Sequence, residues 1–516
     1  SQAEANKIAF DHADVPEYAF EKAGVVFNFS TDFLENWGNP VENARRFTDM
    51  HVYKNGRKNK FIHISPQVSL TGAKADRWIV INPGTEGLVA LAIASVIQKE
   101  NGTYKFLKKY LQAYSPEKVA EATGVSAEIL SELAIDAMEH GPLLALGGGN
   151  VSATDQSVET LVAVNILNAV SGALNKTILF SDQTAPESST HQDLTQLISD
   201  LNAGKIKLLI VDDSNPVYAL PPSMGFLQAM KKAFVVSLAS QKSETTHAAN
   251  LVLPALTAYE SWGDAFPRNG VRSIQQPVMS TVNMFDARAR EDILLSVAQN
   301  VNKKAFSGNS SYLDYLQNIW QKIQRKVGDR RNFDSFWISV LENGGIFEKP
   351  KFIRASLNRR VASVKLNDPG MAGSDGLTLL PTTSLLLGDG SGANKPWLQE
   401  VPDPMSQIVW DSWMEINPDT AQKLGINDRA IVEVSTPYGS VQATAYYHFG
   451  IHRNAIAIPM GQGHQHSGDV ADGFGINVME LLPDQMDKAG SLVFVGAKAK
   501  LKLINEKSYT VNTDGN

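Results

Sequence analysis

The feature that most constrains this chain is an order repeated over its first half, in which a short apolar run, a glycine or proline break and a helix-like segment follow one another. "AGVVFNFST" (23–31) and "NKFIHISP" (59–66) are apolar and rich in β-formers. "DRWIVINPG" (76–84) ends in a Pro-Gly break before "EGLVALAIASVIQKE" (86–100). Strands that alternate with helices are typical of a parallel sheet. We therefore predict an α/β fold, with Thr85 as the N-cap of the helix.

The same order returns in a second unit. "GPLLALGGGNVSATDQ" (141–156) is a strand with a glycine-rich turn, and the helix-like segment after it ends at Gly172, a plausible glycine just past a helix end. Three further strand candidates follow: "TILFS" (177–181), "IKLLIVDD" (206–213) and "AFVVSLAS" (233–240). Residues 286–347 read as helical, and the last unit is strand-rich, with a hairpin pattern in "RAIVEVSTPYGSVQATAYYH" (429–448).

Composition excludes several classes of protein. Apolar residues make up 43% and charged residues 20%, as in ordinary globular proteins. The net charge of −7 gives no support for a nucleic-acid partner. With no cysteine, the chain forms no disulfide and ligates no iron–sulfur cluster through cysteine. No apolar run is long enough to predict a transmembrane helix.

Two strand ends are candidate ligand loops. In "LGGGN" (146–150), Gly147 and Gly148 would let the backbone approach a phosphate, and the next helix offers N–H groups. In "DDSNPVYALPP" (212–222), Asn215 would lie at the carboxyl edge of a parallel sheet, where α/β proteins bind ligands. The alternative is that both segments are turns without a ligand.

Two further groups of polar residues are candidates for acid–base or metal chemistry. Glu244, His247, Glu260 and Asp264 could form such a cluster, although helix caps and loop hydrogen bonds are the alternative. His464 and His466 form an HxH pair in "PMGQGHQHSGD" (459–469), but no other cluster has a zinc spacing. We therefore interpret this stretch as a glycine-rich barrel loop and predict no metal ligand.

Several blocks in order resemble molybdopterin oxidoreductases of the dimethyl-sulfoxide-reductase type. They are "ADRWIVINPGTEG", "DDSNPVYALP", "SETTHAANLVLPALTAYESWGD" and "MEINPDTAQKLGINDRAIVEVSTPYGSV". This resemblance implies two Rossmann-like parallel-sheet units, a helical insertion and a C-terminal six-stranded double-psi-type β-barrel. The implied domains are an α/β unit (1–138), a second α/β unit (139–285), a helical segment with a linker (286–375), a dinucleotide-binding-like barrel (376–503) and a polar tail (504–516).

"STDFLENWGNPVENARRF" and "PMGQGHQHSGDVADGFGINVMELL" more closely resemble the molybdopterin-like half of the B subunit of alternative complex III, and the related subunit of the menaquinone reductase complex. This resemblance implies a non-catalytic scaffold in a membrane quinol:electron-acceptor oxidoreductase, with no cofactor in this segment. Iron–sulfur clusters and c-type haems would lie elsewhere in the complex. The implied partners are a ferredoxin-like half or subunit, to which the tail would lead, multihaem cytochrome c subunits and a quinone-binding membrane subunit. The implied location is peripheral, on the extracytoplasmic (periplasmic) face of the membrane.

Bulky Phe33, Leu34 and Trp37 stand where active members keep small residues, which predicts a filled pocket. The rival prediction is a fragment of an active molybdenum enzyme with a bis-pterin cofactor, so whether the chain is an enzyme stays open. In that case the pterin contacts would be Gly147, Gly148, Asn215, Glu244, Thr245, Asp264, Gly461 and His464. A nicotinamide dehydrogenase is disfavoured, because the chain lacks GxGxxG.

Overall fold

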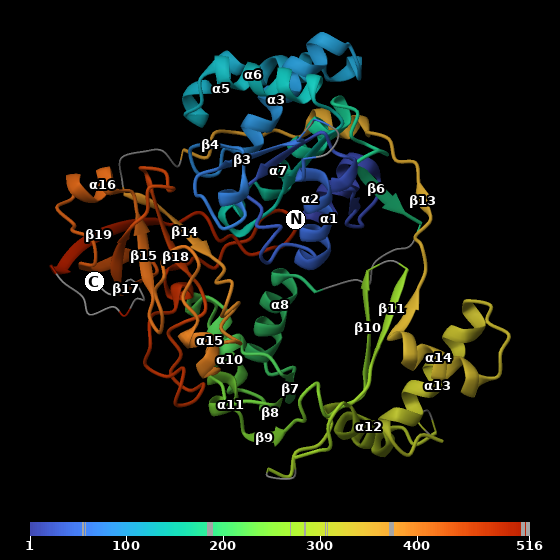
Figure 1. Ribbon diagram of the computed structural model, residues 1–516. Coiled ribbons are helices and arrows are strands. Elements are labelled where there is room, and N and C mark those ends of the chain that lie inside the picture. The colour runs from blue at the N-terminus through green and yellow to red at the C-terminus, as the bar shows by residue number, and fades with distance from the viewer. Residues whose placement is uncertain are drawn as a thin grey trace.

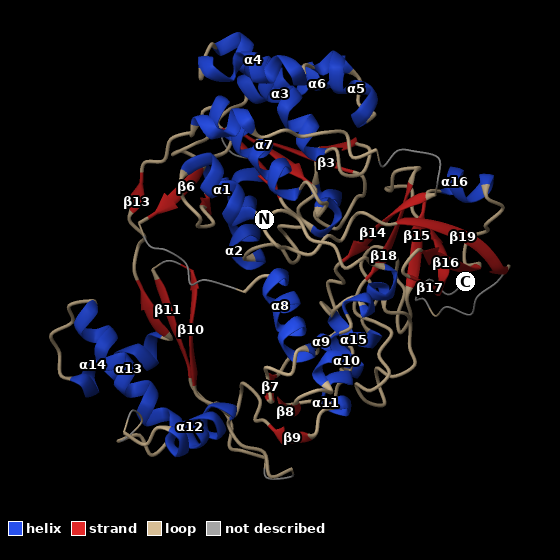
Figure 2. Cartoon of the chain, turned by 180° about the vertical axis from the view of Figure 1, so that it is seen from behind, coloured by secondary structure: helices blue, strands red, loops and turns tan. Residues whose placement is uncertain are grey.

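The computed structural model describes residues 1–53, 56, 58–182, 189–268, 270–282, 285–304, 306, 308–370, 376–506 and 511. The described residues form two parallel sheets, two small antiparallel sheets and a closed barrel (Figure 1; Figure 2). The predicted α/β class with a C-terminal six-stranded barrel is confirmed.

The first parallel sheet has the order β4-β3-β2-β5. Its strands are β2 (Val25–Phe29), β3 (Lys60–Ser65), β4 (Arg77–Val80) and β5 (Leu143–Gly147). The division predicted at residue 139 placed β5 in the second unit, whereas β5 pairs with β2 along its whole length. The helices of this region are α1 (Gln2–Phe10), α2 (Pro40–His51), α3 (Glu86–Asn101), α4 (Lys108–Leu111), α5 (Pro116–Thr123), α6 (Ala127–Glu139) and α7 (Ser157–Val170).

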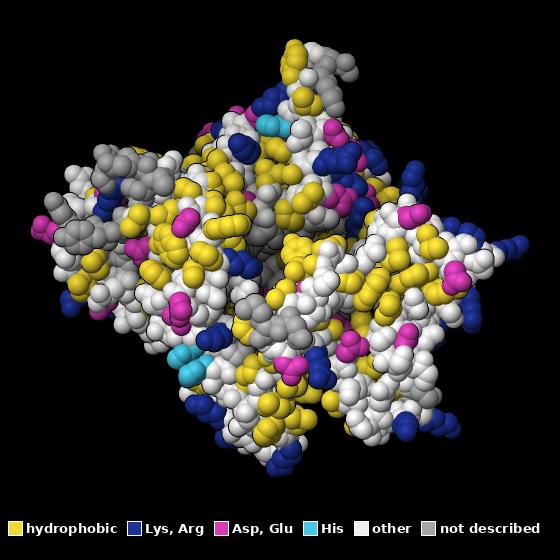
Figure 3. All heavy atoms as spheres, turned by 60° about the horizontal axis from the view of Figure 1, so that its bottom comes forward, with side chains coloured by type: hydrophobic (Ala, Val, Ile, Leu, Met, Phe, Trp, Pro, Cys, Tyr) yellow, Lys and Arg dark blue, Asp and Glu magenta, His cyan; other side chains and the backbone are white. Residues whose placement is uncertain are grey.

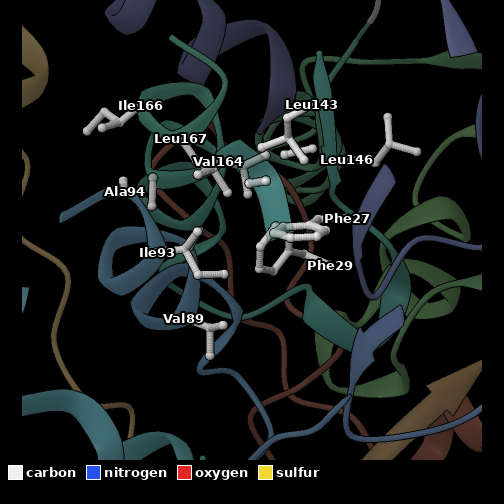
Figure 4. Close-up of a cluster of buried hydrophobic side chains, with 14 of the residues drawn as sticks. Phe27, Phe29, Val89, Ile93, Ala94, Leu143, Leu146, Val164, Ile166 and Leu167 are labelled. Atoms are coloured by element: carbon white, nitrogen blue, oxygen red, sulfur yellow. The ribbon is translucent and has the colours of Figure 1, made fainter. Parts of the chain in front are cut away.

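The core of this unit lies between the sheet and the helices α3 and α7. Figure 4 shows Phe27 and Phe29 of β2 gathered with Ile93 of α3 and Val164 of α7. Helix α3 is buried over residues 86–94, which explains why its sequence is apolar on every side. Thr85 is the N-cap residue, as predicted, but its hydroxyl donates to the Asn82 carbonyl (2.6 Å) and makes no side-chain cap hydrogen bond.

Strand β6 (Ile178–Ser181) forms where "TILFS" predicts a strand, but it does not join the second parallel sheet. It pairs antiparallel with β1 (Glu17–Tyr18) and β13 (Phe352–Ile353). Gly172 follows α7 with φ of 76°, which confirms the predicted glycine past that helix end.

The second parallel sheet is the three-stranded β7-β8-β9. Its strands are β7 (Leu208–Asp212), β8 (Phe234–Ala239) and β9 (Leu251–Pro254). Helices α8 (His191–Asn202) and α10 (Phe226–Met230) contribute to one core with it. The short helices α9 (Pro216–Ala219) and α11 (Glu244–Ala248) begin just after β7 and β8.

The described residues between positions 263 and 347 form an arm beside the second sheet (Figure 1). The predicted helical segment is present as α12 (Arg290–Val301), α13 (Tyr312–Lys326) and α14 (Phe333–Asn343). The antiparallel sheet of β10 (Gly263–Arg268), β11 (Val271–Gln275) and β12 (Gly345–Phe347) was not predicted. Trp320 is fully buried in the core of the arm.

The barrel closes in the order β14-β18-β15-β17-β16-β19. The predicted hairpin forms β16 (Ile431–Thr436) and β17 (Gly439–Tyr447). The other strands and helices are β14 (Leu377–Thr382), α15 (Pro396–Glu400), β15 (Trp413–Ile416), α16 (Pro418–Lys423), β18 (Ala455–Pro459) and β19 (Lys498–Asn505). Over the described ranges, no helix combines the length and the hydropathy that a bilayer crossing requires.

Candidate functional site

Two predicted site loops meet at the carboxyl edge of the second parallel sheet. Asn215 follows β7, and Glu244 begins α11 after β8. The Asn215 amide donates to Glu244 Oε2 (2.6 Å), and Asn215 Oδ1 accepts from the Thr245 amide (3.1 Å) and hydroxyl (2.9 Å). Ends of neighbouring parallel strands share one edge, which is why residues 215 and 244 come together.

The barrel loop that contains the HxH pair closes over this edge. His464 Nδ1 lies 3.2 Å from both carboxylate oxygens of Glu244, and Nε2 lies 3.1 Å from the Gly390 carbonyl. The backbone amides of Gln465 and His466 also donate to Glu244 Oε1, at 2.8 and 3.3 Å. Both ring nitrogens of His464 thus lie within hydrogen-bond distance of oxygen atoms of this chain, one on Glu244 and one on Gly390.

The Glu244 cluster, which we define as Asn215, Tyr218, Glu244, Thr245 and His464, is buried or half-buried. The rings of Tyr218 and His464 stack with centroids 3.8 Å apart. Burial raises the pKa of Glu244, but hydrogen bonds from His464, Asn215 and the Gln465 amide outweigh burial and hold that pKa well below its usual value. The carboxylate therefore stays ionised, with its oxygens committed to donors from this chain.

Glycines make the approach of these loops possible. Gly390 has φ of 102°, and a Cβ there would lie 2.6 Å from the Tyr218 ring and 2.7 Å from His464 Nε2. Gly461, a predicted pterin contact, has φ of 111°, and a Cβ would lie 2.8 Å from Leu387 Cβ. The atoms that an added Cβ would meet belong to this chain, so Gly390 and Gly461 allow the loops to pack closely against each other.

The glycine-rich turn after β5 lies at the edge of the first sheet. Gly148 has φ of 98°, and a Cβ on Gly149 would lie 2.0 Å from the Ser30 carbonyl, so the turn needs glycine to pass the end of β2. The Ser30 hydroxyl donates to Glu86 Oε1 (2.8 Å). Glu86 is fully buried, and among the described residues its Oε2 has no hydrogen-bond partner. Burial raises the pKa of Glu86 to about 7.

A cavity of about 60 Å³ lies between the first sheet and the barrel. Its polar lining includes Asp32, Glu35, Gln67 and Glu415. Burial and the nearby Glu35 carboxylate raise the pKa of Asp32 to about 7. On the barrel side, Glu415 accepts from Gln67 and lies 2.8 Å from His448 Nδ1.

The remaining predicted residues lie in other surroundings. Asp264 is in β10 and accepts from the Trp320 indole (3.0 Å), and Glu260 accepts from Thr257 and from the Val282 amide. His247 stacks on His466 with ring centroids 3.7 Å apart. Within the ranges that the structure describes, no three His, Cys, Asp or Glu side chains are grouped to hold a metal ion. The structure thus records contacts of Glu244, His247, Glu260 and Asp264 with other partners, not a joint metal group.

The bulky residues after β2 do not line the cavity. Phe33 is fully buried and packs against Phe20, Phe47 and Phe61 in the core of the first unit. Leu34 and Trp37 are partly buried against the same core. Trp37 also reaches the glycine-rich turn, where a Cβ on Gly148 would lie 3.9 Å from its Nε1. That these residues fill a pocket which active members leave open stays a prediction. Sequence reasoning also missed Tyr218 and Gly390, because nothing local marks them as partners of residue 464.

Two family models match the chain. A molybdopterin oxidoreductase model matches residues 5–300, and a molydopterin dinucleotide binding domain model matches residues 397–490. The second match covers most of the barrel and its HxH loop.

Among curated relatives, the chain is 27% identical over 504 residues to the menaquinone reductase molybdopterin-binding-like subunit of Nitratidesulfovibrio vulgaris, with 93% of this chain and 71% of the relative covered. It is 21% identical to the arsenate respiratory reductase molybdopterin-containing subunit of a Shewanella species, with 96% of this chain and 76% of the relative covered. Acetylene hydratase from Pelobacter acetylenicus is a solved structure with the same fold, with a TM-score of 0.69 at 16% identity and coverage of 98% and 81%.

The prediction that this segment holds no cofactor is wrong, because both matching models describe molybdopterin families and point to a molybdopterin cofactor here. The side chains as arranged do not fit that group. The amides of Gln465 and His466, which would suit a phosphate, donate to Glu244. We therefore assign no chemical step through the cofactor. With its α/β half and its barrel both matched, the chain belongs to the molybdopterin oxidoreductase family.

Proposed function

We propose that this chain is a subunit of a membrane-associated respiratory oxidoreductase complex that transfers electrons between a quinone pool and an electron acceptor. The observation that carries the proposal is the similarity to the menaquinone reductase subunit, which spans 93% of this chain. An organisation like that of alternative complex III, with the chain peripheral on the extracytoplasmic face, is part of the proposal.

In this proposal the segment supplies no catalytic side chain and acts as a scaffold. The Glu244 cluster supports it, because Glu244 and His464 already use their polar atoms on each other and on neighbouring loops. A group that is to bind substrate or move a proton needs a polar atom free to face the substrate.

The partners in this proposal are carriers that the sequence does not encode. Since this chain has no cysteine, iron–sulfur clusters would belong to a ferredoxin-like half or subunit. Multihaem cytochrome c subunits and a quinone-binding membrane subunit would complete the path. The scaffold would keep these carriers close enough for electron transfer.

A second candidate is an active molybdenum enzyme with a bis-pterin cofactor, favoured by the two family matches. In that case the proposed cofactor contacts are Gly147, Gly148, Asn215, Glu244, Thr245, Gly461 and His464. Asp264 is the weakest member of that set, because it contacts Trp320 in the arm.

The two candidates differ in how turnover depends on His464. The test is quinol:acceptor turnover per assembled complex, purified with wild-type chain or with His464→Gln, which keeps a polar side chain of similar reach. The scaffold proposal predicts turnover within about twofold of wild type. Loss on the order of 10²-fold or more in a fully assembled complex would favour the enzyme, as expected for a group that acts in the chemical step.

A further inference from the structure

The outer face of one helical stretch in the first unit is basic. Residues 105–114 form this stretch, which includes α4. Lys105, Lys108 and Lys109 are exposed, whereas Leu107 and Leu111 are buried in the core of the unit. Residues three and four positions apart lie on the same side of a helix, so the three lysines stand together toward the solvent.

Arg359 adds a fourth cation beside them. It lies in the segment Arg359–Ser363, which packs against Lys105–Leu107. Its guanidinium carbon is 5.7 Å from the centre of the Phe106 ring, and Arg359 is exposed. The half-buried rings of Tyr104 and Phe106 lie 6.1 Å apart, centroid to centroid. We call Lys105, Lys108, Lys109 and Arg359 the basic face.

The basic face lacks an acidic partner among the residues that the structure describes. None of its four cations takes part in an ion pair over those ranges, whereas the neighbouring Arg360 pairs with Asp11. Glu117, the next acidic residue after the stretch, interacts with Lys99 and Lys118. The positive charge of the basic face is therefore available to a partner.

The three lysines are also unfavourable for the local structure. The start of a helix carries partial positive charge, which disfavours cations, and the stretch begins at Lys105. Like charges three and four positions apart repel each other, as Lys105 does with Lys108 and Lys109. In α13, by contrast, Arg325 and Lys326 lie in the last turn, where a helix favours cations. Charges that the local structure does not favour indicate a partner outside the chain.

The basic face lies at an outer end of the molecule. Figure 2 shows α4 at the top, at the opposite end from the arm. Figure 3 shows the lower face, where Lys and Arg side chains are spread among hydrophobic, Asp and Glu side chains. The net charge of −7 would repel the chain as a whole from a negatively charged surface. Attraction therefore needs a local concentration of cations, and the basic face would orient the chain toward such a surface.

The shape and chemistry of the basic face favour a lipid surface. Its cations stand on the outside of a helix, which is a convex surface, whereas peptide segments dock in grooves or at sheet edges. A layer of anionic headgroups is broad and attracts basic residues that protrude from a protein. Tyr104, close to these cations, has an apolar ring with a polar tip, the kind of side chain that is enriched at membrane interfaces.

We propose that the basic face docks the chain on an anionic phospholipid surface, with the phosphate groups of the lipid contacting its four cations. This rests on the proposed function, in which the chain is peripheral to a membrane. An acidic segment of a partner subunit would be a different occupant, and the test separates the two.

The test is flotation of the purified full chain with vesicles of phosphatidylcholine alone or with about one third phosphatidylglycerol. Each basic residue near an anionic surface contributes about fivefold in binding, so three lysines contribute on the order of 10²-fold. We expect a preference of that order for the anionic vesicles at about 0.15 M salt, and its loss at about 1 M salt, where charges are screened within about 3 Å. Equal binding to both kinds of vesicle at the lower salt concentration would overturn the inference.

Removing the charges locates the binding face. Lys105→Gln/Lys108→Gln/Lys109→Gln should abolish the preference for anionic vesicles, while the melting temperature stays equal or rises, because the repulsion between the lysines is gone. Lys322→Gln/Arg325→Gln/Lys326→Gln, at exposed positions of α13, removes the same charge and is the matched control. It should leave the preference within about twofold of wild type. An equal loss in both variants, or no loss in the first, would contradict the proposal.

The complex with its partner subunits separates the other outcomes. If the first variant binds vesicles as wild type does but its complex loses a partner subunit, the basic face binds an acidic protein and the inference is overturned. A chain that prefers anionic vesicles, in a complex without quinol turnover, would overturn the proposed function alone. Quinol turnover in a complex whose chain does not prefer anionic vesicles would overturn only this inference.

Discussion

Replacing Glu244 with alanine should release the 461–468 loop of the barrel from the second parallel sheet. The carboxylate accepts hydrogen bonds from the Asn215 side chain, from His464 and from the amides of Gln465 and His466. These donors come from two units of the fold, so Glu244 is the point at which the sheet edge holds the loop.

The magnitude follows from what the substitution leaves behind. Each buried donor that is left without an acceptor costs about 1–3 kcal/mol. These terms do not add, and because Glu244 is 9% exposed, water replaces part of the loss. We therefore expect the free energy of opening the loop to fall by about 3 kcal/mol, which is about 10²-fold in the opening equilibrium. Glu244→Gln keeps one acceptor oxygen and loses the charge, so about 1.5 kcal/mol is expected.

Hydrogen exchange of the backbone measures this opening directly, because two of the donors are backbone amides. In mass spectrometry, peptides containing Gln465 and His466 should exchange about 10²-fold faster in Glu244→Ala and about tenfold faster in Glu244→Gln. Glu132→Ala is the control: its exposed carboxylate pairs with Arg77 at 2.8 Å, and such pairs contribute about 0–1 kcal/mol.

The pH dependence gives a second check. Because the pKa of Glu244 is lower in the folded state, its contribution is present above its unfolded value of about 4.5 and is lost as the pH falls further toward the folded value. The difference in protection between wild type and Glu244→Gln should thus persist at pH 7 and shrink below pH 4.5. Unchanged exchange of the loop in both variants at pH 7 would refute the assigned hydrogen-bond network.

Three further predictions concern the first parallel-sheet unit. Glu86→Gln should stabilise the protein above pH 7, by an amount on the order of 1–3 kcal/mol. Burial raises the pKa of Glu86 to about 7, so the wild-type protein loses stability as the pH rises from 4.5 to 7. Melting temperatures of wild type and variant at pH 5 and pH 8 check this, and an equal difference at the two pH values would contradict it. Gly149→Ala should lower the free energy of unfolding by about 3 kcal/mol or more, since the new Cβ would lie 2.0 Å from the Ser30 carbonyl. Gly263→Ala is the control, because the atoms nearest to a Cβ there lie at 3.8 Å, and soluble yield and melting of the two variants are compared. Phe33→Ala should lower the free energy of unfolding by denaturant by about 3–5 kcal/mol. Phe449 is 82% exposed, so Phe449→Ala is the control and should lower it by less than about 0.5 kcal/mol. Similar values for the two variants would mean that Phe33 is not a core residue.

Much of the fold was predictable because parallel strands carry a strong local pattern. The apolar runs of β2, β3, β7 and β8, each bounded by turn residues, predicted strands where they form. Pairing was less predictable: β5 joins β2 and β6 pairs with β1 and β13, since the partner of a strand is decided by packing. The hairpin of β10 was missed because "GDAFPR" contains a proline and lacks apolar alternation.

The candidate site was predictable only for residues whose place in the sequence fixes their place in the fold. Asn215, Glu244 and Thr245 follow neighbouring parallel strands, so their convergence follows from topology. The family resemblance gave His464 only as a pterin contact beside them, and its direct contact with Glu244 was not predicted. Gly390 and Tyr218 became visible only in the structure, because residues far apart in sequence form this contact. Asp264 was selected for its motif, but packing places it against Trp320.

The central claim is that the chain is a subunit of a respiratory quinone-linked complex and supplies no catalytic side chain to it. The most direct measurement is quinol:acceptor turnover per assembled complex for wild type and His464→Gln, with molybdenum, tungsten and pterin content determined on the same preparations. Our account predicts turnover within about twofold between the two, whatever metal content is found. A loss on the order of 10²-fold in an intact, equally loaded complex would contradict it and place His464 in an active site.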